Sequence, residues 1–352
     1  KECYGCTACK CICPTEAITM KSDNEGFLYP VVDENFCIAC NLCIDVCPMK
    51  NEVDIKDHFE IPEVYAVKHT SDLVRLLSSS GGAYTAISDF IIKDKKGICY
   101  GATFDEEFNV RHKEAITTSE RNKFRGSKYV QSKLGNVFYH IKQNLVNGKL
   151  ILFTGTPCQN AGLVKYLKLS KIDTSNLILN DIVCHGVASP KIWKDYVVFI
   201  EEKNKSKIKN YTFRFKEKGW RGYNVKVEFE NNTIKLNTKD VLKYVKLFNF
   251  NLILRPSCYN CKFSNLNRPS DLTIGDFWGI EKSMPGFEDT KGVSLVLVNT
   301  RRGKDIFERI KSNLIYRQSN ISDCMQLNLY QPTPKPENRE KFWKDYGEKG
   351  FK

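Results

Sequence analysis

The sequence has no apolar stretch that approaches the about 18 residues of a membrane-spanning helix, so it predicts no membrane span. Its first residues show no signal-peptide pattern. It also lacks a segment in which basic and aromatic residues interleave, which argues against nucleic acid as a partner. Fifteen cysteines without a secretion signal indicate a reducing compartment, where thiols bind metal instead of forming disulfides. We therefore expect a cytoplasmic protein.

Outside the first segment of the chain, acidic residues are too few to balance the basic ones. Residues 1–61 hold 5 Lys/Arg and 11 Asp/Glu, a net charge of −6, and the remaining residues carry +19 within a total of +13. A basic body of this kind would attract an anionic partner, such as an acidic electron carrier, a phosphorylated cofactor or a nucleic acid. The alternative is that the lysines only improve solubility. With 352 residues and 41% hydrophobic content, the chain can form two or three domains.

Nine of the 15 cysteines lie in the first 47 residues, in two copies of one pattern. Each copy reads C-x2-C-x2-C-x3-C-P, which is the run that holds bacterial 4Fe-4S clusters. Three closely spaced thiolates bind one cluster, and the fourth cysteine of the run ligates the other cluster. Zinc or disulfides are the alternatives, but zinc sites use two cysteines per knuckle without a trailing proline. We expect two 4Fe-4S clusters, the first held by Cys3, Cys6, Cys9 and Cys47 and the second by Cys37, Cys40, Cys43 and Cys13, with Cys11 as a bystander.

The hydropathy pattern predicts three parts, which together give an α+β or α/β fold. Residues 1–58 form a two-cluster ferredoxin-like module, with short strands at 17–20 and 29–32 and a charged connector at 51–62. Residues 59–208 alternate strands with helices, which indicates a mixed sheet with helical cover. Residues 209–352 add antiparallel strands and a cysteine pair. We expect helices at 71–77, 83–92, 136–146, 160–169, 190–202 and 240–248, strands at 63–68, 98–104, 149–153, 177–184, 211–216, 225–230, 233–236, 272–276 and 293–298, and an extended, proline-rich tail.

Two segments of the middle part have the composition of ligand-binding loops. Ser80, Gly81 and Gly82, with Thr85 shortly after, join two predicted helices and could cradle an anion, or could form only a turn. The segment 154–159 follows a buried strand, where ligands bind in open sheets. Cys158 in that segment could be a nucleophile, a cluster ligand or a small buried residue.

Four further cysteines are candidates for a third metal centre. Cys158 and Cys184 follow strands that we expect to be neighbours, and Cys258 and Cys261 have a two-residue spacing. A third cluster, zinc, a redox disulfide and unliganded cysteines all remain open from spacing alone. A thiol–disulfide reductase using Cys158 or Cys184 is a further reading. His185 follows Cys184 directly, and Cys99 and Cys324 are expected to pack in the interior.

These residues together resemble the coenzyme F420 hydrogenase/dehydrogenase beta-subunit family, in its form with an N-terminal ferredoxin module. The resemblance covers about residues 63–280. It rests on six ordered stretches, which are Ser79-Ser80-Gly81-Gly82-Ala-Tyr-Thr85, Gly126-Ser127-Lys128-Tyr129-Val130-Gln131-Ser132, Phe153-Thr-Gly155-Thr156-Pro157-Cys158-Gln159-Asn-Ala-Gly162-Leu, Asp181-Ile-Val-Cys184-His185-Gly186-Val-Ala-Ser189-Pro190, Arg255-Pro-Ser-Cys258-Tyr-Asn-Cys261 and Ser270-Asp271-Leu-Thr-Ile-Gly275-Asp276-Phe277-Trp278-Gly279.

The resemblance implies a flavoprotein that holds its flavin in residues 59–208. We expect FAD, with FMN as the alternative. It implies flavin contacts from the Ser80–Thr85 loop and from Lys128, Tyr129, Gln131 and Ser132, and we add Gly155, Thr156 and Pro157 at the strand end. It also favours a third 4Fe-4S cluster on the four later cysteines. Lys128 would stabilise the reduced flavin electrostatically, and Cys158 and His185 are further catalytic candidates.

The expected function is that of an iron–sulfur flavoprotein oxidoreductase. It would pass electrons between its clusters, the flavin and a soluble partner such as ferredoxin, the deazaflavin coenzyme F420 or a small acceptor. The alternatives are a non-catalytic electron-transfer subunit of a hydrogenase or dehydrogenase complex and a basic, metal-stabilised binding module. A homo-oligomer is compatible with each of them.

Overall fold

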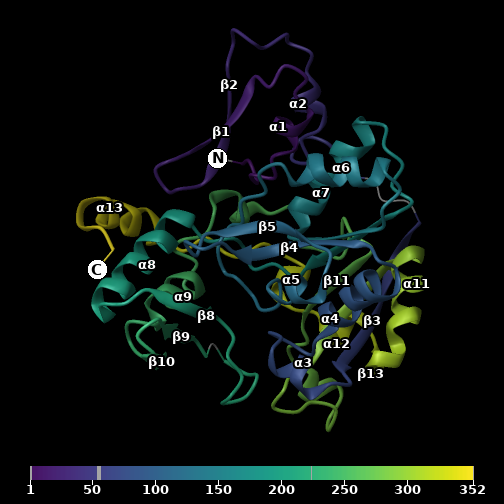
Figure 1. Ribbon diagram of the computed structural model, residues 1–352, viewed down its shortest axis with the longest axis vertical. Coiled ribbons are helices and arrows are strands. Elements are labelled where there is room, and N and C mark those ends of the chain that lie inside the picture. Colours follow the sequence, from purple (N-terminus) through teal and green to yellow (C-terminus); the bar gives the residue numbers. More distant parts are fainter. Residues whose placement is uncertain (1, 54–56, 223, 352) are drawn as a thin grey trace.

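The computed structural model describes residues 2–53, 57–222 and 224–351, and its central feature is a mixed sheet of eight strands. Part of the predicted connector, residues 54–56, lies outside the described residues. The strands follow the spatial order β13-β3-β12-β11-β7-β6-β4-β5. Figure 1 labels β3, β4, β5, β11 and β13 of this sheet. Their bounds are β3 His58–His69, β4 Ile98–Phe104, β5 Val110–Ala115, β6 Ile151–Gly155, β7 Leu177–Ile182, β11 Leu272–Asp276, β12 Ser294–Thr300 and β13 Leu314–Ser319.

The middle of this sheet is parallel and both of its sides are antiparallel. β4, β6, β7 and β11 pair in parallel, whereas β5 pairs antiparallel with β4, and β12, β3 and β13 continue antiparallel from β11. The predicted mixed α/β fold is therefore confirmed. The late strands β11–β13 belong to the same sheet as β3–β7. Strands from both sides of the boundary predicted at residue 208 therefore form one sheet.

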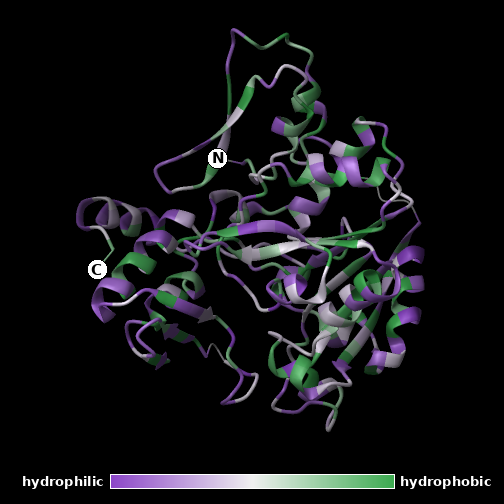
Figure 2. Cartoon of the chain, viewed as in Figure 1, coloured by the Kyte–Doolittle hydropathy of each residue, from purple (hydrophilic) through white to green (hydrophobic). Residues whose placement is uncertain are grey.

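Both faces of the sheet are covered, which is why its inner strands read as continuous apolar runs. In β6, Ile151 and Phe153 pack toward α6 and α7, while Leu152 between them packs toward α4 and α11. Figure 2 shows hydrophobic stretches in the central strands and hydrophilic residues on outer helices such as α11 and α13. The helices around the sheet are α3 Asp72–Leu76, α4 Ala83–Asp89 (continued by a π-helical turn, Phe90–Asp94), α5 Thr118–Asn122, α6 Val137–Val146, α7 Pro157–Leu169, α10 Ile280–Ser283, α11 Arg301–Ile310 and α12 Ile321–Cys324.

A second lobe lies beside the sheet and has its own aromatic core. Its three-stranded antiparallel sheet has the order β10-β9-β8 and packs with three helices around Trp193 and Tyr244. The elements are α8 Pro190–Asn204, β8 Ile208–Thr212, β9 Lys226–Phe229, β10 Ile234–Leu236, α9 Leu242–Asn249 and α13 Arg339–Lys349. The C-terminal segment was predicted to be extended, but after its prolines it forms α13, which buries Tyr346 in this core.

The N-terminal segment forms a small head, which lies at the top of Figure 1. It contains α1 Ala8–Ile12, the hairpin of β1 Ile18–Ser22 and β2 Leu28–Val32, and α2 Leu42–Asp45. α1 contacts α7 and α6 of the body, and Ala8 and Val46 of the head join the core beneath them. The head therefore packs directly on the helices that cover one face of the sheet.

Several element boundaries differ from the prediction, each for a local reason. The strand expected to end at Cys184 ends at Ile182, and α7 begins at Pro157, so Cys158 lies in its first turn. Thr156 caps α7 reciprocally with Gln159, which starts this helix three residues early. β8 ends at Thr212 instead of 216, and Arg214 beyond its end lines a large cavity. Within the ranges that the structure describes, no helix has the length and apolar content of a membrane span.

Candidate functional site

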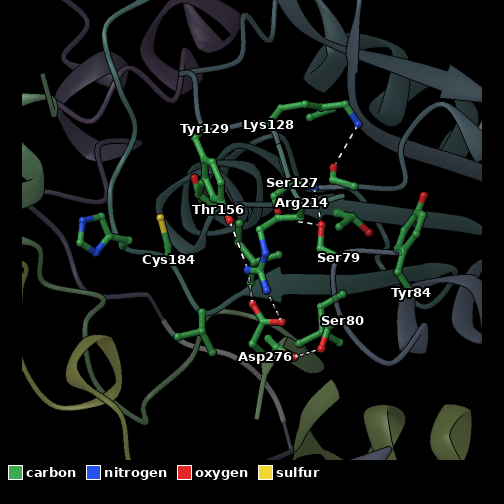
Figure 3. Close-up of a pocket in the computed structure, with 18 of the residues that line it drawn as sticks. Ser79, Ser80, Tyr84, Ser127, Lys128, Tyr129, Thr156, Cys184, Arg214 and Asp276 are labelled. Atoms are coloured by element: carbon green, nitrogen blue, oxygen red, sulfur yellow. Dashed lines mark hydrogen bonds and ion pairs between the residues drawn. The ribbon is translucent and has the colours of Figure 1, made fainter. Parts of the chain in front are cut away.

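A cavity of about 480 Å³ opens where the parallel strands end, which is the usual position of a ligand site in an open α/β sheet. Its volume lies in the range of small-molecule and cofactor pockets. The lining combines the loop between α3 and α4, segment 124–130, the ends of β6, β7 and β11, and Arg214 from the second lobe (Figure 3). Residues far apart in sequence thus meet at one end of the sheet.

Seven of the eleven residues predicted to bind cofactor line this cavity, namely Ser80, Gly82, Lys128, Tyr129, Ser132, Gly155 and Thr156. Gly81 does not line it, because it faces β3. A Cβ added at Gly81 would lie 2.2 Å from the carbonyl oxygen of Val67 in that strand. Thr85 is buried and accepts a hydrogen bond from Arg125 Nε at 3.1 Å.

The other two predicted residues lie on the side of the head. Gln131 donates to the carbonyl oxygen of Tyr4 at 3.0 Å, so it joins the head to the body. Pro157 lines a second, smaller cavity together with Cys158. Their neighbours Val130, Ser132 and Thr156 line the large cavity, whereas Gln131 and Pro157 face the head.

Lys128 lines the cavity, but its ammonium turns back to its own loop. Nζ donates to the carbonyl oxygens of Lys123 and Arg125 at 2.9 Å each and of Gly126 at 3.2 Å. Figure 3 shows the side chain extending away from Tyr129 and Arg214. Burial lowers the pKa of Lys128 to about 7, and the three carbonyl groups oppose this shift because they stabilise the ammonium form. The geometry gives Lys128 a role in holding the loop.

A buried ion pair forms another wall of the cavity. Arg214 Nη1 and Asp276 Oδ2 are 2.9 Å apart, and Trp220 Nε1 donates to Asp276 Oδ1 at 2.7 Å. Burial acts to lower the pKa of Arg214, but Asp276 and Tyr129 together outweigh burial and raise the pKa, so the guanidinium stays charged. Trp278 stacks on Trp220 with ring centroids 5.0 Å apart. Trp278 is also 39% exposed and lines the cavity, so it offers an aromatic surface next to a fixed charge.

The lining also contains buried polar atoms with no protein partner among the described residues. They are the Tyr84 hydroxyl and Nδ1 of His112. His112 Nε2 bonds to the carbonyl oxygen of Thr154 at 3.0 Å, and burial lowers the pKa of His112 to about 4. The imidazole is therefore neutral, and Nδ1 is left as a hydrogen-bond acceptor. Unpaired buried polar atoms in a large, partly aromatic pocket fit a bound polar ring system such as a flavin.

The four later cysteines line the second cavity together. Cys158, Cys184, Cys258 and Cys261 come from the start of α7, the end of β7 and a short 3-10 turn, Pro256–Asn260. β6 and β7 are neighbours in the sheet, which brings the first two together. The chain after β7 pairs with the segment before the turn, where Arg255 donates its backbone N–H to the carbonyl oxygen of Val187 at 2.9 Å. This pairing brings in the other two cysteines.

The electrostatic effects of these thiols on one another show that the four groups lie close together. Burial raises the pKa of Cys158 to about 12, and the charges of Cys261 and Cys258 add to the shift. Burial likewise raises the pKa of Cys184, with contributions from the other three. Among the described residues, no three such side chains are placed to hold a single metal ion. A 4Fe-4S cluster binds one thiolate at each of four separate irons, and four cysteines around one cavity fit that donor set.

The two cavities share a wall formed by residues 184–187. Cys184 lines both cavities, whereas Cys158 lines only the cysteine cavity, with its Sγ 3.1 Å from Thr156 Oγ1. His185 Nε2 is 2.7 Å from Asn251 Oδ1, so the structure gives its imidazole a protein partner. Of the three predicted catalytic candidates, Cys158 lies at the cysteine cavity and His185 at the shared wall, whereas Lys128 lies at the large cavity.

The cysteines of the head divide into one converging set and one more exposed set. Burial raises the pKa of Cys9 to about 12, and the charges of Cys3 and Cys47 add to this shift. Burial also raises the pKa of Cys6, and the charges of Cys9 and Cys3 raise it further. Cys43 also acts on Cys9, and Cys158 acts on Cys6; apart from these two, the group consists of the four residues predicted for the first cluster. In the second set, Cys37 and Cys40 are exposed, and hydrogen bonds from Thr15, Ala17 and Ile18 outweigh burial and lower the pKa of Cys13.

Sequence reasoning gave no role to several residues of the site. Asp276 and Trp278 lie in a family-like stretch, so a signal for them existed. Arg214 and His112 lie in segments that alternate like ordinary strands, and only their positions in the fold reveal them.

Comparison with known proteins adds an assignment by family. The family described as the C terminus of the coenzyme F420 hydrogenase/dehydrogenase beta subunit matches residues 148–323, and a 4Fe-4S dicluster domain matches residues 2–51. No curated protein matches the chain. A chain from a solved structure, titled as a xenon derivatization of the F420-reducing NiFe hydrogenase complex from Methanosarcina barkeri, is 17% identical. That alignment covers 84% of this chain and 92% of the other, with a TM-score of 0.49.

The first family match spans half of the sequence and includes the strands that form the cavities. The second covers the head with both cysteine runs, which makes this an iron–sulfur protein. The chain belongs to the coenzyme F420 hydrogenase/dehydrogenase beta subunit family, a family of oxidoreductase subunits, and carries a 4Fe-4S dicluster domain at its N-terminus.

Proposed function

We propose that the protein is an iron–sulfur flavoprotein oxidoreductase that passes electrons between 4Fe-4S clusters, a flavin in the large cavity and a soluble redox partner. The observation that carries the proposal is the shared wall of the two cavities, where Cys184 lines both. When bound, clusters exchange single electrons and a flavin accepts one or two. A cofactor pocket that touches a cysteine-lined cavity is the arrangement such an exchange requires.

The second supporting feature is the position of the head. Cys6 packs against α7, since a Cβ added at Gly162 would lie 2.8 Å from its Sγ. The charge of Cys158, one of the four later cysteines, also acts on Cys6. We assign a cluster to Cys3, Cys6, Cys9 and Cys47 and another to Cys158, Cys184, Cys258 and Cys261, so the three sites form a row from the head through the cysteine cavity to the large cavity.

In this proposal the residues of the large cavity bind and orient FAD. The Tyr84 hydroxyl and His112 Nδ1 would bond to its polar edges, and Trp278 would cover an aromatic face. Arg214 keeps a positive charge at the site, because Asp276 stabilises it, and would favour a reduced, more negative ring. Lys128 orders the loop that carries Tyr129. Ferredoxin or the deazaflavin coenzyme F420 is the partner class we expect.

The test is an anaerobic visible spectrum with iron, sulfide and flavin measured on the same sample. We expect two or three clusters and one flavin per chain. His112→Phe should lower the flavin content while keeping the iron, because the ring still packs on Phe153 but loses its acceptor. His140→Phe is the matched control, since His140 is exposed on α6, outside the cavity. Full iron without any flavin in the wild-type protein would refute the proposal.

A second candidate function is that of a subunit docked on a larger redox complex. The observation that favours it is a group of exposed apolar side chains in the head near the second cysteine run, formed by Val31, Val32, Phe36, Ile38 and Ile44. Phe36 and Ile38 flank the exposed Cys37, so a partner protein covering them would lie close to that cluster. Purification of the native protein decides the question: a stable complex supports the subunit, whereas a lone chain with its own turnover excludes it.

A further inference from the structure

Arg255 differs from every other buried arginine that the structure describes. Six arginine residues are buried, and five of them form an ion pair with an acidic side chain. The paired ones are Arg75 with Asp289, Arg121 with Asp89, Arg214 with Asp276, Arg268 with Asp181 and Arg339 with Glu25. Arg255 is fully buried, and its acceptors in the described residues include no carboxylate. An uncompensated buried charge is strongly destabilising, so its compensation must come from elsewhere.

The contacts of Arg255 lie between the head and the body. Nε donates to the carbonyl oxygen of Cys3 at 2.6 Å, and Nη2 donates to that of Leu28 at 2.9 Å. Nη1 donates to Gln131 Oε1 at 2.9 Å, and the guanidinium lies 4.3 Å from the ring centroid of Tyr29. These partners are neutral dipoles and an aromatic face, which orient the charge but do not cancel it.

Both converging sets of cysteines surround this charge. Arg255 lines the cavity of the four later cysteines, and Cys3, whose carbonyl it bonds, belongs to the first set of the head. Its charge also opposes the effect of burial on the thiols of Cys158 and Cys258. The thiolates that would hold the two clusters are therefore negative groups close to this guanidinium.

We propose that Arg255 is a positioning residue for electron transfer: it holds one positive charge between the two clusters and thereby raises their reduction potentials. The inference rests on the proposed function for the presence of the clusters. Reducing a cluster takes one electron from an external donor and adds one negative charge, without making or breaking a bond. A fixed, dry cation nearby stabilises that added charge more than the oxidised state.

The experiment is a dithionite titration of the anaerobic protein with redox mediators, followed by electron paramagnetic resonance. In Arg255→Gln we expect the reduction equilibrium of at least one cluster to fall tenfold or more, a change of about 59 mV for one electron. Arg255→Lys retains the charge and should stay within about threefold of the wild type. A tenfold fall in Arg255→Lys would show that the hydrogen bonds matter instead, and would overturn the proposal. If Arg255→Gln fails to assemble its clusters, the lysine variant alone decides.

The matched control is the double variant Glu25→Gln with Arg339→Gln. This pair also joins the head to the body, through Arg339 Nη1 and Glu25 Oε1 at 2.9 Å, but the double change leaves the net charge unaltered. Its potentials should match those of the wild type. Equal shifts in the control and in Arg255→Gln, or no shift in Arg255→Gln with full iron and flavin, would overturn the role of Arg255 alone. A wild-type protein without iron would instead refute the proposed function.

Discussion

Replacing Gly162 with alanine tests the packing of the head against the body. Gly162 is buried in α7, and a Cβ at this position would lie 2.8 Å from Cys6 Sγ and 2.9 Å from Cys6 Cβ. Real Cβ atoms do not approach other atoms so closely, so either α7 or the head must move. Cys6 itself is only 8% exposed, and as a cluster ligand it could not rotate away.

Two opposing effects set the magnitude. Alanine is favoured over glycine inside a helix by about 0.5–1 kcal/mol. Overpacking a well-packed core costs about 1–3 kcal/mol. Because the clash involves a side chain held at two ends, by the backbone and by the expected cluster, we expect the overpacking term to dominate. Gly162→Ala should therefore destabilise the protein by up to about 2 kcal/mol, and should disturb the cluster bound by Cys6.

The assay is anaerobic denaturant unfolding followed by circular dichroism, with electron paramagnetic resonance of the reduced protein as the second readout. The control is Gly347→Ala in α13, where an added Cβ meets no atom within 4 Å. This change should raise stability by about 0.5–1 kcal/mol through helix propensity alone. If both variants raise the midpoint equally and the cluster signals are unchanged, Cys6 does not pack on α7 and the reasoning fails.

Three further changes probe the cavities. Cys258→Ala should remove the iron of one cluster while the flavin content stays high. The control is Cys324→Ala, which changes a buried cysteine of the core and should retain all the iron. Unchanged iron in both variants would remove Cys258 from the ligand set. Asp276→Ala leaves Arg214 without its acidic partner and should lower the free energy of unfolding by about 3 kcal/mol, which denaturant titration measures. It should also lower the flavin content, which flavin fluorescence measures. A loss of unfolding free energy below about 1 kcal/mol would contradict the buried pair. His112 has its pKa lowered to about 4 in the folded state, so the unfolded state binds the extra proton as pH falls from about 6.5 toward 4, and stability falls with it. In that window His112→Phe should reduce the slope of unfolding free energy by up to about 1.4 kcal/mol per pH unit, and an unchanged slope would mean that the imidazole is not held neutral.

The two cysteine runs could be interpreted from the sequence because their chemistry is local. Spacers of two residues place three thiols of one run on one short segment, whatever the remainder of the chain does. The dicluster domain was therefore predictable, as were the inner strands, whose apolar runs reflect burial on both faces of the sheet.

The positions that connect these parts depend on the tertiary structure. Cys258 reaches Cys158 only because the segment before it pairs with the chain after β7, and Arg214 reaches the cavity only because β8 ends early. Gln131 and Arg255 contact the head instead of the large cavity, since the head packs on α7. The contacts of Gln131 and Arg255 with the head join residues more than a hundred positions apart, and local spacing carries no information about them. The sequence determined which groups this protein has for electron transfer, whereas strand order and the docking of the head decided how they are arranged.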